Sequence, residues 1–114
     1  MLSDLELSRR VEGKVAVLVL AGQIDYDNCH ELRDAIDDCL DDGLGRILID
    51  AKGLSFIDSS CIGMLVAALR KVGEQGGRMC MVVSTHIERV LTVSGMTTLF
   101  ELFADTESAL RELK

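Results

Sequence analysis

The run from Val15 to Ala21 is continuously apolar. Alternating apolar and polar residues would indicate a strand with one face in water, whereas an unbroken apolar run indicates a strand covered on both faces. Two more runs of this kind follow, at residues 46–50 and 79–83. Strands buried on both sides need helices to cover them, so the sequence predicts an α/β fold with a parallel or mixed sheet.

Apolar residues at helical spacing separate these runs. Residues 32–40 follow this spacing, behind Asn28 and Glu31, a pair that resembles a capping box. A second helix is predicted to begin near Ser59, with an apolar stripe over residues 62–72. Glycines close both helices.

The third helix is predicted to begin with a second capping box, formed by Thr85 and Glu88. Residues 99–103 are expected to hold a short last strand, and Asp105 or Thr106 to cap a final helix.

A hairpin is predicted at the start of the chain, where residues 5–11 partly alternate and Gly13 supplies a turn before the first buried strand. The element order is therefore β-β-α-β-α-β-α-β-α. We expect a mixed sheet of about four to five strands, packed by about four helices, in one domain over residues 1–114.

Charge and apolar content exclude several classes of function. The formal net charge is −7, which opposes binding to nucleic acids and to anionic membranes. The segment Met1–Asp4 lacks the pattern of a signal peptide, and the apolar run at 15–21 is too short to insert across a membrane. We therefore expect a cytoplasmic protein without nucleic-acid or membrane-inserted partners.

The four cysteines are not spaced for a metal site. None belongs to a CxxC pair, and the two histidines do not supply the missing spacing, so no metal is expected. Three of the cysteines fall at core-like positions, where a free thiol packs as a small apolar group. The cysteines are Cys29, Cys39, Cys61 and Cys80.

Two polar loops follow buried strands, at residues 23–27 and 56–60. Ligands and partners of such sheets usually bind at the carboxyl ends of the strands. The sequence Asp58-Ser59-Ser60 in the second loop is well suited to cap a helix. A phosphoryl group on Ser59 would be tolerated there, because a helix N-terminus favours anions, and it would change what the surface repels.

Other readings of this region remain open. A serine hydrolase would need a base, and only His30 and His86 are available, without a GxSxG motif. Asp25 and Asp27 would be able to bind a cation together with Asp58, although capping and loop solvation also explain them. The strand order is expected to bring Asp25 near Ser59.

Three apolar residues of the second helix lie off its inner stripe and are expected to form a modest exposed patch. This patch is either a docking surface beside Ser59 or incidental exposure. Its residues are Cys61, Met64 and Ala68.

The segment Leu54–Gly63 resembles the signature of STAS-domain anti-sigma factor antagonists, in which the first serine after the aspartate accepts a phosphoryl group. That serine is Ser59 here. Gly22 to Asp25, Gly76-Gly77 and Ser94-Gly95-Met96 are similar to further motifs of this family. One departure is Cys61, which stands where the family usually has glycine.

The resemblance implies a single STAS domain that works by partner switching. The unphosphorylated form would bind an anti-sigma serine kinase and release a sigma factor, and phosphorylation of Ser59 would weaken binding. A PP2C-type phosphatase would reverse the modification. The chain itself would be no enzyme and would need no cofactor, because the kinase binds ATP.

Site roles follow from the same resemblance. Asp58, Ser60 and Asp25 would shape the switch loop. A free monomer is expected for a separate reason, because the acidic surface shows no long apolar face. The candidates for partner contact are Tyr26, Ile57, Cys61, Met64 and Ala68. Alternatives with the same fold are a regulator of a secretion system and a subunit of a lipid-transport complex, and a small serine hydrolase is a further one.

Overall fold

The computed structural model describes residues 4–95 and 99–114. Within them the chain forms the predicted order of elements. These are β1 (Leu5–Glu12), β2 (Val15–Ile24), α1 (Cys29–Asp41), β3 (Arg46–Ile57), α2 (Ser59–Glu74), β4 (Arg78–Val83), α3 (Thr85–Val93), β5 (Glu101–Phe103) and α4 (Thr106–Leu113).

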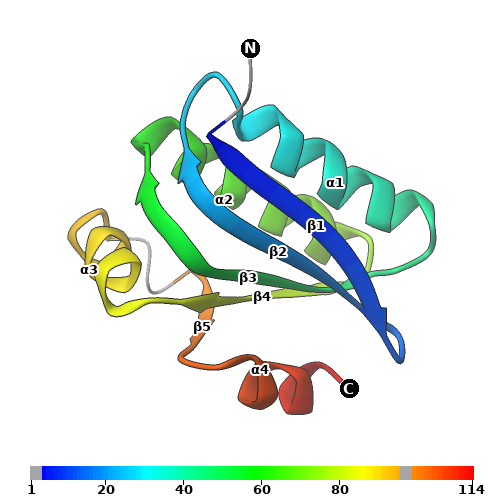
Figure 1. Cartoon of the computed structure of the whole chain (residues 1–114). Coiled ribbons are helices and arrows are strands. Elements are labelled where there is room, and N and C mark those ends of the chain that lie inside the picture. The colour runs from blue at the N-terminus through cyan, green and yellow to red at the C-terminus, as the bar shows by residue number, and fades with distance from the viewer. Residues whose placement is uncertain (1–3, 96–98) are drawn as a thin grey trace.

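The strands form one mixed sheet in the order β1-β2-β3-β4-β5. The first two strands are an antiparallel hairpin, as predicted, and each later strand is parallel to its neighbour. The α/β fold with a five-stranded mixed sheet is therefore confirmed. The carboxyl ends of β2, β3 and β4 lie at one end of the sheet, where α3 also lies (Figure 1).

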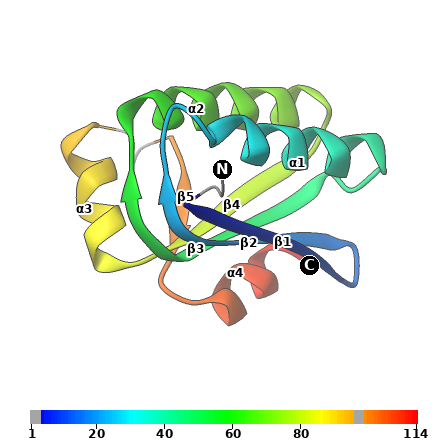
Figure 2. The ribbon, with the colours of Figure 1, turned by 45° about the horizontal axis from the view of Figure 1, so that its top comes forward.

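Helices cover both faces of the sheet, as the unbroken apolar runs require. Helices α1 and α2 lie on one face and α4 on the other (Figure 2). Successive residues of β2 alternate between the two cores: Leu18 packs under α1 and α2, and Val17 packs against α4. Both side chains are completely buried.

Strand β3 is longer than the sequence indicated. The apolar run predicted a strand over residues 46–50, but β3 continues to Ile57 by pairing with β2. The register between β2 and β3 shifts twice in this extension, between Val19 and Ala21 and again between Gly22 and Gln23. Such irregularities bend a strand and redirect its end, and here they redirect the segment that leads into α2.

Gly77 shows why the segment before β4 needs glycine. A Cβ atom on Gly77 would lie 2.3 Å from the carbonyl oxygen of Gly45, at the start of β3. The next amide, of Arg78, donates to that same oxygen at 2.8 Å. Glycine thus allows the two strands to begin side by side.

Two predicted capping boxes are wrong. Asn28 precedes α1 without a side-chain cap, because its amide is used within the preceding loop. At α3 the cap is Ser84, one residue before Thr85, and its Oγ accepts from the Ile87 amide at 3.2 Å. The Asp105 alternative for α4 is confirmed, since its carboxylate accepts from the Ser108 amide at 2.8 Å.

The cysteines are mostly buried. Three of the four cysteines are buried, which is the number predicted, and Cys29 is half-buried. The buried three include Cys61, which was expected on an exposed patch. In the described part of the chain, no helix has the length and apolar character that a membrane crossing requires. The Met96 motif position lies outside the described residues.

Candidate functional site

The two polar loops lie side by side at the carboxyl ends of β2 and β3. Ile24 and Ile57 are partners in the last register position of these strands. Just beyond them, the Asp58 amide donates to the Ile24 carbonyl at 3.1 Å. This bond joins the segment containing Asp25 to the start of α2, as the predicted strand order required.

Asp58 is the N-cap of α2. Its Oδ1 accepts from the Ser60 amide at 2.9 Å and from the Ser60 hydroxyl at 3.0 Å. These bonds, chiefly the one from the backbone, lower the pKa of the Asp58 carboxyl, so the cap stays ionised at neutral pH. Ser59 is the first residue of α2 and is exposed.

The neighbouring loop, at residues 23–28, is stabilised by hydrogen bonds from its own side chains to its own backbone. Asp25 Oδ1 accepts from the amides of Asp27, at 2.9 Å, and Asn28, at 3.2 Å. Asn28 Oδ1 accepts from the Asp25 amide at 2.9 Å, and its Nδ2 donates to the Gln23 carbonyl at 3.1 Å. Asn28 is only 6% exposed, so it braces the loop from within.

The surface around Ser59 carries negative charge and no basic side chain from either loop. Asp25, Asp27 and Asp58 lie in residues 23–28 and 56–63, which contain neither lysine nor arginine. A phosphoryl group on Ser59 would therefore add charge to an acidic surface without a local cation from these segments to pair it.

The expected apolar patch on α2 is wrong. Cys61 is completely buried, Ala68 is 8% exposed, and Met64 packs against the core. The reason is that α2 has a wide buried face, because it contacts both the sheet and α1 (Figure 2). Ile57 is also buried, at 5% exposure, so of the predicted contact residues Tyr26 alone is prominently exposed, at 76%.

Phe56 is a surface residue that the sequence reasoning missed. It is 46% exposed next to buried Ile57, at the end of β3. Side chains alternate along a strand, so placing Ile57 inward would have placed Phe56 outward. Exposed aromatic side chains thus lie on both loops, Tyr26 on one and Phe56 on the other. Gly63 is exposed too, one turn of α2 after Ser59.

The geometry supports neither a serine hydrolase at Ser59 nor a cation site at the aspartates of the two loops. Ser60 is bonded to Asp58, and in the described residues neither His30 nor His86 is hydrogen-bonded to Ser59. Residues 4–95 and 99–114 contain no cluster of three or more side chains suited to hold a metal ion. The carboxylates of Asp25 and Asp58 are instead occupied by loop and cap amides.

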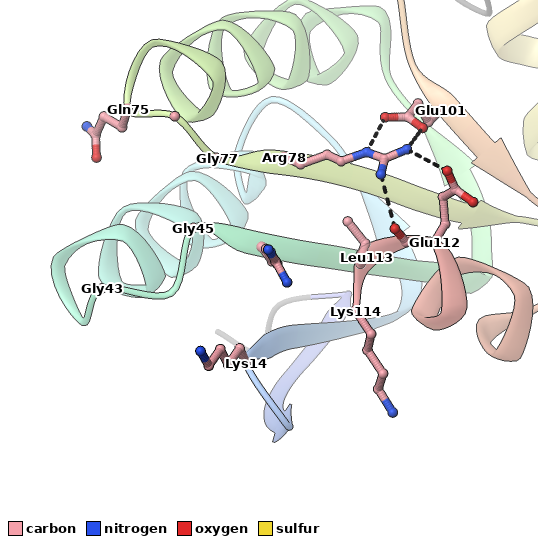
Figure 3. A pocket seen from close by; sticks show the side chains of 12 residues that line it. Lys14, Gly43, Gly45, Gln75, Gly77, Arg78, Glu101, Glu112, Leu113 and Lys114 are labelled. Atoms are coloured by element: carbon pink, nitrogen blue, oxygen red, sulfur yellow. Dashed lines mark hydrogen bonds and ion pairs between the residues drawn. The ribbon is translucent and has the colours of Figure 1, made fainter.

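A pocket lies at the opposite end of the sheet (Figure 3). Its volume is about 850 Å³, and it lies where β3 and β4 begin. Arg78, one of the four basic residues that line it, is already paired with Glu101 and Glu112 (Figure 3). Arg78 also donates to the Glu112 carbonyl at 3.1 Å, so this guanidinium joins β4, β5 and α4.

A family model described as "Mlab, STAS domain" matches residues 7–103. The chain therefore belongs to the STAS domain family. An anti-sigma F factor antagonist from Paenibacillus polymyxa is 24% identical over 113 residues, covering 97% of each chain.

Solved structures show the same fold. An anti-sigma factor antagonist from Mycobacterium paratuberculosis superposes with a TM-score of 0.86 at 22% identity, over 96% of this chain and 93% of the other. The Bacillus cell fate determinant SpoIIAA, in its phosphorylated form, gives a TM-score of 0.71 at 24% identity, over 96% and 99% of the two chains.

Proposed function

We propose that this protein is an anti-sigma factor antagonist that works by partner switching, with Ser59 as the phosphoacceptor. The observation that carries the proposal is the position of Ser59, exposed at the first residue of α2 beside the Asp58 cap. It is supported by the relatives, several of which are named anti-sigma factor antagonists.

In the unphosphorylated state the surface around Ser59 docks onto an anti-sigma factor that is a serine kinase, and a sigma factor is released. Tyr26 and Phe56 offer exposed aromatic area on the two loops, a kind of side chain enriched in protein interfaces. Gly63 is exposed and has no side chain, so a partner is able to approach the backbone of α2 closely there. Ile57, Cys61 and Ala68 support this surface from beneath.

Phosphorylation opposes docking by charge. A phosphoserine carries roughly −1.5 to −2 charges at pH 7. One added charge about 6 Å from a partner's carboxylate or nucleotide phosphate costs about 1.4–2.8 kcal/mol at an effective dielectric constant of roughly 20–40. That is a weakening of roughly tenfold to a hundredfold. The fold itself tolerates the group, because it lies at a helix N-terminus.

The protein acts in this scheme as a substrate and not as an enzyme. The kinase binds the ATP, so the domain needs no cofactor of its own. A PP2C-type phosphatase removes the phosphoryl group and restores the binding form. The domain is a monomer when free of its kinase.

The test is intact-mass spectrometry of the protein incubated with ATP and each candidate kinase encoded in its own genome. We expect one added phosphoryl group on the wild type and none on Ser59→Ala. The matched control is Ser60→Ala, which keeps the acceptor but loses one bond to Asp58. Modification of Ser59→Ala, or of no protein by any kinase, would overturn the proposal.

A second candidate function is a subunit of a lipid-transport complex, which the description "Mlab, STAS domain" favours. Such a subunit would co-purify with an ATPase and a permease and would need no phosphorylation. Affinity purification from its own cells separates the candidates: a serine kinase in the eluate supports partner switching, and a permease supports transport. Recovery of secretion-system components would instead point to a regulator of secretion.

A further inference from the structure

Two of the four cysteines lie at the starts of neighbouring helices. Cys29 is the first residue of α1, and Cys61 lies in the first turn of α2. The strands before them end at Ile24 and Ile57, which are partners in the sheet. Because both helices cover the same face of that sheet, their first turns lie close together (Figure 2).

The Cys29 thiol neighbours that of Cys61 at the edge of the core. Cys29 is half-buried and packs against the core cluster that contains Cys61, which is completely buried. Burial raises the pKa of the Cys61 thiol to about 12, and the adjacent thiol of Cys29 contributes to this increase. Cys61 is therefore protonated at neutral pH, while Cys29 is the member of the pair that solvent reaches.

The other cysteines are placed elsewhere. Cys39 is buried towards the far end of α1, and Cys80 lies on β4 in the core of the opposite face of the sheet. Cys39 belongs to the same core cluster as Cys61 but lies at the opposite end of α1 from Cys29, and Cys80 lies on the other face of the sheet, so both serve as internal controls.

We propose that Cys29 and Cys61 form a reversible disulfide under oxidising conditions, making the pair a redox-sensitive modification site beneath Ser59. The reducing compartment expected for this chain keeps the pair as thiols until an oxidant is present. Cys61 stands where the family resemblance leads one to expect glycine, so this site belongs to this chain's own sequence.

The chemistry balances with a peroxide as the oxidant. The Cys29 thiol loses its proton, and the thiolate attacks one oxygen of hydrogen peroxide. The O–O bond breaks, Cys29 becomes a sulfenic acid, and the departing hydroxide takes up the proton that Cys29 lost, which gives one water molecule. The Cys61 sulfur then attacks the Cys29 sulfur, the S–O bond breaks, and the hydroxyl leaves as a second water molecule with the Cys61 proton. Two thiols lose two electrons and two protons, and one peroxide is reduced to two waters. A small dithiol reverses the reaction by exchange.

The consequence for Ser59 rests on the proposed function. A crosslink between the first turns of α1 and α2 restricts local opening of the segment that carries Ser59. We therefore expect oxidised protein to be phosphorylated more slowly than reduced protein, by severalfold or more.

The first experiment treats the folded protein with equimolar hydrogen peroxide and measures intact mass and disulfide-linked peptides. We expect a monomer lighter by two hydrogens, with Cys29 linked to Cys61, restored by dithiothreitol. The variant Cys39→Ser/Cys80→Ser should behave identically, and Cys29→Ser, whose thiol is half-exposed, should fold and form no internal disulfide. If wild type forms no internal disulfide, or links another pair, the proposal is wrong.

The second experiment compares phosphorylation of oxidised and reduced protein by the cognate kinase. Slower phosphorylation of oxidised wild type, with no such change in peroxide-treated Cys29→Ser, supports the regulatory role. Equal rates would overturn that role. If the disulfide forms but even the reduced protein is never phosphorylated, the proposed function fails while the cysteine pair stands.

Discussion

Replacing Gly63 by alanine should strengthen the fold and weaken partner binding at once. Gly63 lies inside α2, and a Cβ atom there would meet nothing within 4 Å. In a helix interior, alanine gives a free energy of unfolding about 0.5–1 kcal/mol higher than glycine does. For a domain of this size that raises the melting temperature by about 2–4 °C.

The expected loss of binding comes from the position of Gly63. It follows Ser59 by four residues, so both lie on one side of the helix. A methyl group forced into a close-packed contact costs about 1–3 kcal/mol, which is a loss of about fivefold to somewhat more than a hundredfold in affinity for the kinase.

Gly73→Ala is the matched control. Gly73 lies near the other end of α2, is also exposed, and has the same open space around its missing Cβ atom. Thermal unfolding should show a similar gain for both variants, whereas isothermal titration calorimetry with the kinase should show weakening for Gly63→Ala only. Equal affinities for the two variants would refute the placement of the docking surface.

Three further predictions concern stability. Gly77→Ala should lower the free energy of unfolding by roughly 1–3 kcal/mol in denaturant titrations, because its Cβ atom would collide with backbone. Ser84→Ala should cost about 1 kcal/mol through loss of the cap of α3, and Thr85→Ala clearly less; equal losses would contradict the cap assignment. Arg78 lowers the pKa of Glu101, so the ion pair stabilises the fold above about pH 4.3 and loses this effect as the pH falls further. The stability difference between wild type and Arg78→Met should therefore shrink in acid, and a difference independent of pH would exclude this origin.

The order of elements was predictable because it depends on burial patterns that are local in sequence. The unbroken run at Val15–Ala21 required cover on both faces, and the structure supplies it with α1, α2 and α4. The end of β3 was not predictable in the same way. Residues 52–57 include exposed polar side chains, and they form a strand because β2 pairs with them across two register shifts.

The position of Ser59 was predictable, but the surface around it was only partly so. Its helix start follows from Asp58 and the apolar stripe behind it, which are local signals. The burial of Cys61 and Ala68 depends on how closely α1 packs beside α2, which no local pattern specifies. The cap predicted at Asn28 failed for a different, local reason: its side chain bonds to Asp25 and Gln23 within its own loop, and these bonds replace capping.

The central claim is that a negative charge on Ser59 separates this domain from its partner. The most direct test is the dissociation constant for the cognate kinase, measured by calorimetry with unmodified protein and with protein phosphorylated on Ser59. The account predicts that the phosphorylated form binds at least roughly tenfold more weakly. Equal dissociation constants for the two forms would contradict it.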